Sequence, residues 1–294
     1  MLKLRSSFLR LVTLLLVASI LMMGCSANRF LYNRADTFVR WVLDDYVDLT
    51  AEQQQRFDAG LEALLDWHRR HELPLYRDFI VSSLNALEDG VTIDEAVYIS
   101  ESIEEAANRL QAQFLELLLE NAAALSDDQL QAFLTELDRQ QGEYAEERLT
   151  RDDEKYAEDS ADSLESLAKR LLGRLNTDQK SVIQRRSIEL KRIDRLWHQD
   201  RQVWGGQLRA ILESRSPGWQ DHIRNLVDSR SEARTPDYVA GIEHNGDIIL
   251  ALLVDTINSR TERQDRRMRQ FLDDLIADID ALTVATVAED LVVQ

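Results

Sequence analysis

Residues that interrupt α-helices are rare in this chain, and this constrains its fold more than any other feature. Three prolines and ten glycines occur among 294 residues. Leu, Ala, Glu, Gln and Arg, which favour helices, are abundant, and runs typical of strands or turns are few. The sequence therefore predicts an all-α protein, a bundle with several long antiparallel helices.

Short motifs mark the predicted helix starts. Three of them share the order leucine, capping residue, any residue, acid and glutamine: LTAEQ from Leu49, LSDDQ from Leu125 and LNTDQ from Leu175. The second residue of each can cap a helix, and the glutamine three positions later suits a capping box. Thr92 and Glu95 form a related start. The motif is either a repeated binding module or a set of capped helices in one bundle, and its uneven spacing favours the bundle.

These starts and the chain breakers divide the sequence into predicted helices. They cover residues 36–46, 51–72, a piece after Pro74 that reaches residue 88, 93–123, 127–172, 177–213, 219–227 and 247–281. The stretch 127–172 is one helix or two, with Gly142 as the point in question. The predicted helical domain is 36–281, with a possible subdivision near residue 173 and a C-terminal tail over 282–294.

The short loop around residues 173–176 predicts an antiparallel hairpin between the helices on its two sides. Counting outward from that loop brings the acidic run 152–159 near the basic run 191–195. We therefore expect residues 153 and 195 to lie on facing helices.

The N-terminal residues follow the three-part order of a secretory signal. Lys3, Arg5 and Arg10 are basic, residues 11–23 are mainly apolar, and Gly24 is small. Thirteen helical residues span about 20 Å, which is short of the roughly 30 Å hydrocarbon core of a bilayer. Residues 1–24 are therefore predicted to be a signal peptide.

Gly24 and Cys25 directly after this apolar run resemble the lipobox of bacterial lipoproteins, in which the chain is cut before the cysteine and lipid is joined to it. The resemblance implies that Cys25, the only cysteine, is lipidated and that residues 25–35 form a tether. Ser26 implies release to the outer membrane, with the protein facing the periplasm. The alternative is an uncleaved signal anchor in which Cys25 has no special role.

The charge of the chain limits its partners. Its net charge is −18, and removal of residues 1–24 would leave 32 basic against 53 acidic side chains, or −21. Such a charge opposes binding to nucleic acid and to anionic lipid surfaces. Covalent lipid is therefore the predicted link to the membrane, and no nucleic-acid partner is expected.

Motifs for catalysis are scarce. The sequence has no GxSxG elbow, no phosphate-binding glycine loop and no HExxH. The best metal candidate is His68, His71 and Glu72, spaced to share one helical face, although an ordinary surface histidine pair explains them as well. A second set, either an acid–base pair or a solvated helix end, is Asp44, Asp45 and Asp48. No cofactor is expected.

An arginine stripe is the candidate partner site. No apolar side chain lies between residues 258 and 267, and Arg260, Arg263 and Arg267 would share one face of the last predicted helix. Arginine suits bidentate binding of carboxylate or phosphate. The stripe either pairs with acidic helices of the same chain or binds an envelope protein or anionic envelope component.

The block YNRADTFVRWVLDDYVDLTAEQ, which starts at Tyr32, resembles the opening of an uncharacterised family of proteobacterial helical lipoproteins. The positions that carry the resemblance are Tyr32, Asn33, Arg34, Trp41, Asp45, Tyr46, Leu49, Thr50 and Gln53. It implies an outer-membrane lipoprotein and brings no established activity. We therefore expect a non-enzymatic binding or structural protein of the envelope. The alternative is an envelope hydrolase with a metal at His68 and His71.

Overall fold

The computed structural model describes residues 27–292, so the predicted signal peptide and Cys25 lie outside the described residues. Every regular element in this range is a helix and none is a strand, which confirms the all-α class. The helices are α2 (Ala27–Tyr32), α3 (Ala35–Asp44), α4 (Ala51–Trp67), α5 (Leu73–Ala86), α6 (Ile93–Ala122), α7 (Asp127–Tyr144), α8 (Asp153–Leu172), α9 (Thr177–Ile188), α10 (Asp194–Ser214), α11 (Trp219–Asp228), α12 (Pro236–Asn258) and α13 (Glu262–Val292). Among them, none combines the length and the apolar composition that a membrane span requires.

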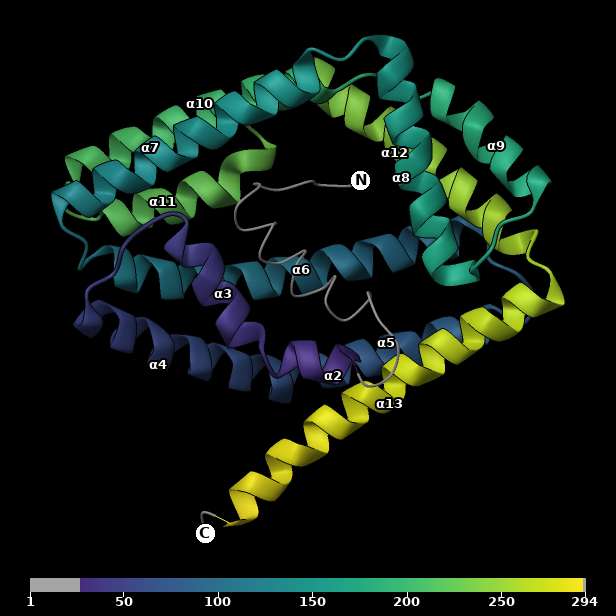
Figure 1. The fold of residues 1–294 in the computed structure, drawn as a ribbon, viewed down its shortest axis with the longest axis horizontal. Helices are drawn as coiled ribbons and strands as arrows, with labels where there is room; N and C mark the ends of the chain where they lie inside the picture. The colour runs from purple at the N-terminus through teal and green to yellow at the C-terminus, as the bar shows by residue number, and fades with distance from the viewer. Residues whose placement is uncertain (1–26, 293–294) are drawn as a thin grey trace.

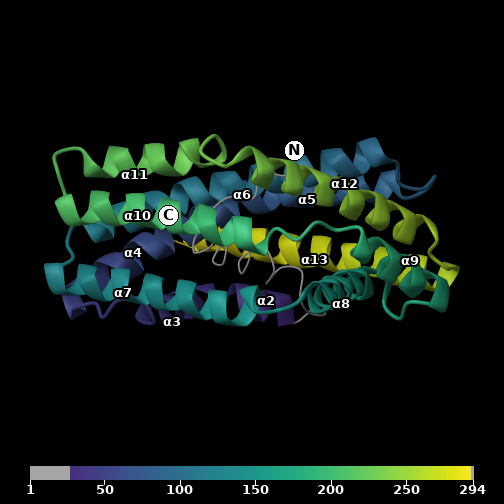
Figure 2. The same cartoon turned by 90° about the horizontal axis from the view of Figure 1, so that it is seen from above.

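The helices form an elongated body (Figures 1 and 2). Helices α7 and α10 lie side by side along one edge, and α4 and α5 follow the opposite edge (Figure 1). The C-terminal part of α13 projects away from the other helices. This arrangement agrees with the predicted bundle of long helices.

Two main apolar clusters stabilise the body. One gathers buried side chains of α3, α4, α6, α7, α10 and α11, including Phe57, Leu110 and Leu134. The other gathers those of α8, α9, α12 and α13 with the end of α5 and the start of α6. Each cluster takes residues from both sides of residue 173. The boundary between the two clusters therefore does not fall at residue 173 of the sequence.

The predicted helix caps are present and are joined in pairs. Thr50, Ser126 and Asn176 each accept the backbone N–H three residues later, and the corresponding glutamine side chain bonds back to the cap. Gln53 and Gln129 also exchange amide hydrogen bonds of 2.7 and 3.0 Å. Each of the two donates in addition to a backbone carbonyl just before the other's cap, those of Ala124 and Asp48.

The same arrangement occurs at the other end of the molecule. Gln179 and Gln264 exchange amide hydrogen bonds of 3.2 and 2.9 Å, and Gln264 donates to the carbonyl of Arg174. The cap that Gln264 serves is Thr261, at the start of α13. The repeated motif thus fixes pairs of helix starts, α4 with α7 and α9 with α13, which lie at opposite ends of the long axis (Figure 1). This supports capped helices of one bundle as the meaning of the repeat.

The structure corrects three predicted helices. The stretch 127–172 is interrupted at residues 150–152, where Asp152 caps α8, and not at Gly142. The predicted helix 177–213 is two helices, because residues 189–193 leave the helical path, and the predicted helix 247–281 is two helices that turn at residues 259–261. The other predicted helices agree with the structure within a few residues at each end.

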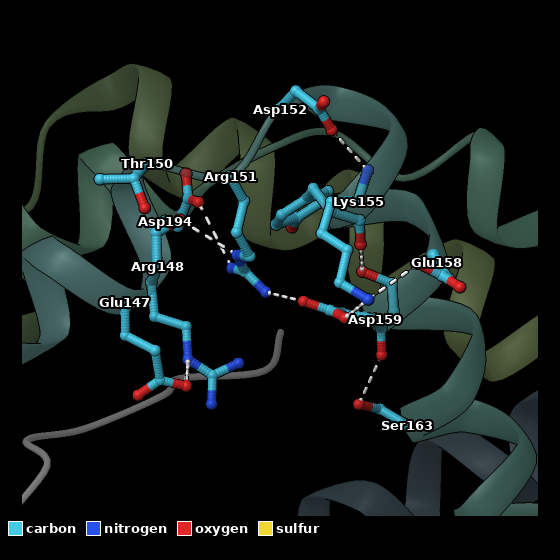
Figure 3. Close-up of polar contacts among 12 residues, drawn as sticks. Glu147, Arg148, Thr150, Arg151, Asp152, Lys155, Glu158, Asp159, Ser163 and Asp194 are labelled. Atoms are coloured by element: carbon cyan, nitrogen blue, oxygen red, sulfur yellow. Dashed lines mark hydrogen bonds and ion pairs between the residues drawn. The ribbon is translucent and has the colours of Figure 1, made fainter.

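The predicted hairpin is formed by α8 and α9, and its acidic run meets the basic run at Arg192. Figure 3 shows the neighbouring contacts of Arg151 with Asp159 and Asp194. Asp153 pairs with Arg192 at 3.0 Å, so the partner is Arg192 in the loop before α10 and not residue 195 on a helix. Arg151 bridges Asp159 at 2.6 Å and the buried Asp194 at 3.5 Å. These ion pairs join the start of α8 to the start of α10.

The described parts of the predicted tether and tail contain helices. Within the predicted tether, α2 packs against α13: Tyr32 is buried, and Arg29 pairs with Asp278 at 3.1 Å. Helix α13 continues past residue 281 to Val292, and Leu282 is buried. Helix α2, which follows Cys25 closely in the sequence, therefore packs against the last helix.

Candidate functional site

The predicted arginine stripe is divided by the turn between α12 and α13. Arg260 lies in that turn with its side chain 11% exposed. It donates to Asp265 at 2.7 Å and to the carbonyl of Leu87 at 2.6 Å. These bonds attach the turn to the end of α5, so Arg260 is a structural residue and does not share a face with Arg263 and Arg267.

Arg263 and Arg267 instead meet Arg174, which lies in the turn between α8 and α9. The three side chains are exposed and line a hollow of about 610 Å³ whose lining includes no acid. None of the three forms an ion pair with a residue in the described range. A neighbouring hollow of about 750 Å³ differs, because Arg260 and Arg266 share it with Glu88, Asp89, Glu262 and Asp265. The positive hollow is therefore the better candidate for an anionic partner.

Local structure explains why these arginines converge. The starts of α9 and α13 are joined by Gln179 and Gln264, which brings the two preceding turns together. Gly173 has φ +75°, and a Cβ there would lie 2.6 Å from Cδ of Arg267, so glycine permits both the turn and the close approach. The first turn of a helix carries partial positive charge. Two helix starts and three guanidinium groups thus contribute to one positive surface.

The predicted metal residues serve other contacts. His68 is 2% exposed, and its Nδ1 lies 2.9 Å from the Tyr32 hydroxyl. Burial lowers the pKa of His68 to about 4, although the charge of Glu72 opposes this, and burial raises the pKa of Tyr32 to about 12. His71 is exposed, and its ring stacks on Trp67. The two histidines therefore lie in different environments.

Glu72 is bound by an arginine. Its buried carboxylate accepts from Nε and Nη2 of Arg109 on α6, at 2.8 and 2.9 Å. In the part of the chain that the structure describes, no group of three His, Cys, Asp or Glu side chains is placed to hold a metal ion. His68, His71 and Glu72 are thus not assembled as a metal centre.

A π-helical turn, His68–Glu72, produces this arrangement. Pro74 follows it at the start of α5; proline lacks the N–H that would bond to the carbonyl of residue 70, and its ring crowds that carbonyl. The wider turn places both His68 and Glu72 on the buried side. Such turns often occur at functional sites, but here the side chains contact Tyr32 and Arg109.

The aspartates at the end of α3 line neither of the two hollows described above. Asp44, Asp45 and Asp48 are all exposed. Trp41 beside them is 61% exposed and packs edge-on against Phe38. All three carboxylates reach solvent, so the arrangement matches a solvated helix end.

Sequence reasoning missed Arg174 and Arg109. Arg174 stands two residues before a recognised cap, but its importance depends on the turn between α12 and α13, which was predicted as continuous helix. Arg109 lies 37 residues from Glu72 on a different helix. No local pattern connects either arginine with its site.

Comparison with known proteins gives a family and no activity. A model described as a family of unknown function, DUF6279, matches residues 45–239. This range includes His68, Glu72, Arg109 and Arg174 and ends before Arg263 and Arg267. No curated protein and no solved structure matches the chain. Because the matched range covers more than half of the 294 residues, the chain belongs to this family of unknown function.

Proposed function

We propose that this protein is a lipid-anchored, non-enzymatic protein of the cell envelope that binds an anionic group of another envelope component. Cys25 carries the lipid, and the helical body faces the periplasm from the outer membrane. The binding surface is the hollow lined by Arg174, Arg263 and Arg267.

One observation carries the binding role. Three exposed guanidinium groups without ion-pair partners in the described range converge on one hollow, in a chain that has 53 acidic and 35 basic side chains. With so many acids available, intramolecular pairing would be easy to arrange, as it is for Arg260. Arginines that remain unpaired around one hollow suit bidentate contact with a partner's carboxylate or phosphate.

The anchor rests on the sequence around Cys25. A basic segment, an apolar run and Gly24 before Cys25 support signal cleavage and lipidation. A single acyl chain gives only marginal membrane binding, so stable attachment requires at least two. The rival function, a hydrolase with a metal at His68 and His71, gains no support from the two different environments of those histidines.

Lipidation is tested at Cys25. Cells that express the protein and are fed labelled palmitate should incorporate label, and Cys25→Ser should abolish it and leave an uncleaved precursor. Ser26→Ala serves as the control, because it alters the neighbouring side chain and leaves the sulfur in place. Undiminished labelling of Cys25→Ser would disprove the anchor.

The binding surface is tested by photo-crosslinking in intact cells. A crosslinking amino acid at position 263 should give a discrete adduct, because this side chain lines the hollow. The double substitution Arg174→Glu and Arg267→Glu should remove that adduct, since it replaces two attractive charges with two repulsive ones.

The control has the same change of charge on neighbouring helices. Arg170→Glu with Arg185→Glu alters two exposed arginines that do not line the hollow, so the adduct should persist. Helical circular dichroism checks that both variants fold. An adduct that survives reversal of Arg174 and Arg267 would rule out this surface.

A further inference from the structure

A second group of arginines lies away from the exposed hollow, where α10 meets the turn between α11 and α12. Arg201 is on α10, Arg230 is in the 3₁₀ turn η3 (Ser229–Ser231), and Arg234 is just before the cap of α12. The carboxylate of Asp200 on α10 accepts a hydrogen bond from Nη2 of Arg230 at 2.5 Å. We call these three arginines the arginine triad.

The triad is largely withdrawn from water. Arg230 is 4% exposed and Arg234 is 9% exposed, and Arg201 is partly buried. Aromatic rings cover the guanidinium groups: Trp197 lies 4.8 Å from Arg201, Trp204 lies 4.9 Å from Arg230, and Tyr238 lies 5.6 Å from Arg234. Such stacking covers the faces of a guanidinium and leaves its N–H edges available.

Several of those N–H edges are buried without a hydrogen-bond partner in the described residues. They are Nη1 of Arg201, Nε and Nη1 of Arg230, and Nε and Nη2 of Arg234. Most buried polar groups in folded proteins are hydrogen-bonded, so five unsatisfied nitrogens on neighbouring cations require an explanation. The charges also repel, since burial and the neighbouring Arg230 lower the pKa of Arg201 to about 10.

The geometry of the Arg234 guanidinium indicates which kind of acceptor would complete its hydrogen bonds. Its Nε and Nη2 form the edge that binds two oxygens at once. Elsewhere in this molecule the same edge holds a carboxylate: Arg109 binds Glu72, and Arg224 binds Glu116 at 2.7 and 2.6 Å. At Arg234 this edge is buried and has no such acid.

We propose that the arginine triad binds a phosphate group, either free phosphate or a small phosphomonoester. Arg234 contacts two of its oxygens through Nε and Nη2, and the remaining N–H groups of Arg230 and Arg201 contact the others. Three guanidinium charges and the Asp200 carboxylate leave a charge of about +2, which matches a phosphate that carries about −1.5 to −2 near neutral pH. A phosphate also offers more acceptor oxygens than a carboxylate.

Calorimetric titration of inorganic phosphate into the full-length protein in detergent tests this proposal. We expect saturable binding to one site per chain in a buffer free of other oxyanions. Arg234→Lys keeps the charge but removes the two-nitrogen edge, so it should weaken binding at least about tenfold. Arg201→Gln, at the most exposed member of the triad, provides a second variant if Arg234→Lys does not fold.

Two controls make the outcome decisive. Arg209 lies on α10, as Arg201 does, but its side chain pairs with Asp138. The Arg209→Gln variant should therefore bind phosphate as tightly as the unaltered protein does. Acetate should bind much more weakly than phosphate. Any of three results would overturn the proposal. The heat of phosphate titration could be no larger than that of chloride titration, a folded triad variant could bind phosphate with unchanged affinity, or acetate could bind as tightly as phosphate.

Discussion

Arg109→Met should lower the free energy of unfolding by about 3 kcal/mol, because it leaves the carboxylate of Glu72 buried without its partner. Glu72 is 2% exposed and bonds to Nε and Nη2 of Arg109. The estimate is at the lower end of the range for such pairs, since the Arg109 side chain is 41% exposed and water can replace part of the lost interaction. Urea denaturation followed by helical circular dichroism measures the change.

A double substitution separates the buried charge from the packing. In Arg109→Met with Glu72→Met no unpaired carboxylate remains, so the double variant should be more stable than Arg109→Met alone. Arg56→Met removes an exposed helical pair with Glu52 and should change stability by only about 0 to 1 kcal/mol. If Arg109→Met costs no more than Arg56→Met, the pair does not stabilise this junction.

Helix starts could be predicted from the sequence because their chemistry is local. At each of Thr50, Ser126 and Asn176, cap and glutamine are three residues apart, and each forms the expected box. The start at Thr261 was missed because its acid, Glu262, follows the cap directly and arginine stands before Gln264. The pairing of these glutamines across the fold depends on residues about 80 apart and has no local signal.

The helix breaks could not be predicted for the same reason. Residues 189–193 contain no glycine or proline, yet the chain turns there because the Asn245 side chain on α12 bonds to both the N–H and the carbonyl of Lys191 at 2.8 Å. Asn258 does the same for Val91. Tertiary contacts that satisfy backbone groups thus override a sequence with good helix propensity.

The candidate site also combines a feature that the sequence reveals with contacts that only the fold reveals. A local excess of arginine around residues 258–270 is visible in the sequence, and Arg263 and Arg267 do line a positive hollow. Whether an arginine there is free or paired depends on the turn, which directs Arg260 to Asp265 and Leu87. The sequence therefore locates the positive charge, whereas the contacts of each arginine can be read only from the folded structure.

Acidification should destabilise the protein through His68. Burial lowers the pKa of this imidazole from 6.5 to about 4, with opposition from the charge of Glu72. Between these values the unfolded chain binds a proton at this residue and the folded chain does not, so the free energy of unfolding falls as the pH falls. As the pH falls from 6.5 to about 4, the free energy of unfolding should decrease by about 3 kcal/mol through His68.

Denaturation of the protein and of His68→Phe at several pH values from 7 to 4 isolates this contribution. His68→Phe leaves the Tyr32 hydroxyl without its 2.9 Å partner, but this cost is the same at every pH and does not affect the slope. Carboxylates elsewhere titrate in both proteins, so the difference between the two curves reports His68 alone. Identical slopes for the protein and His68→Phe would show that His68 remains accessible to protons in the folded state.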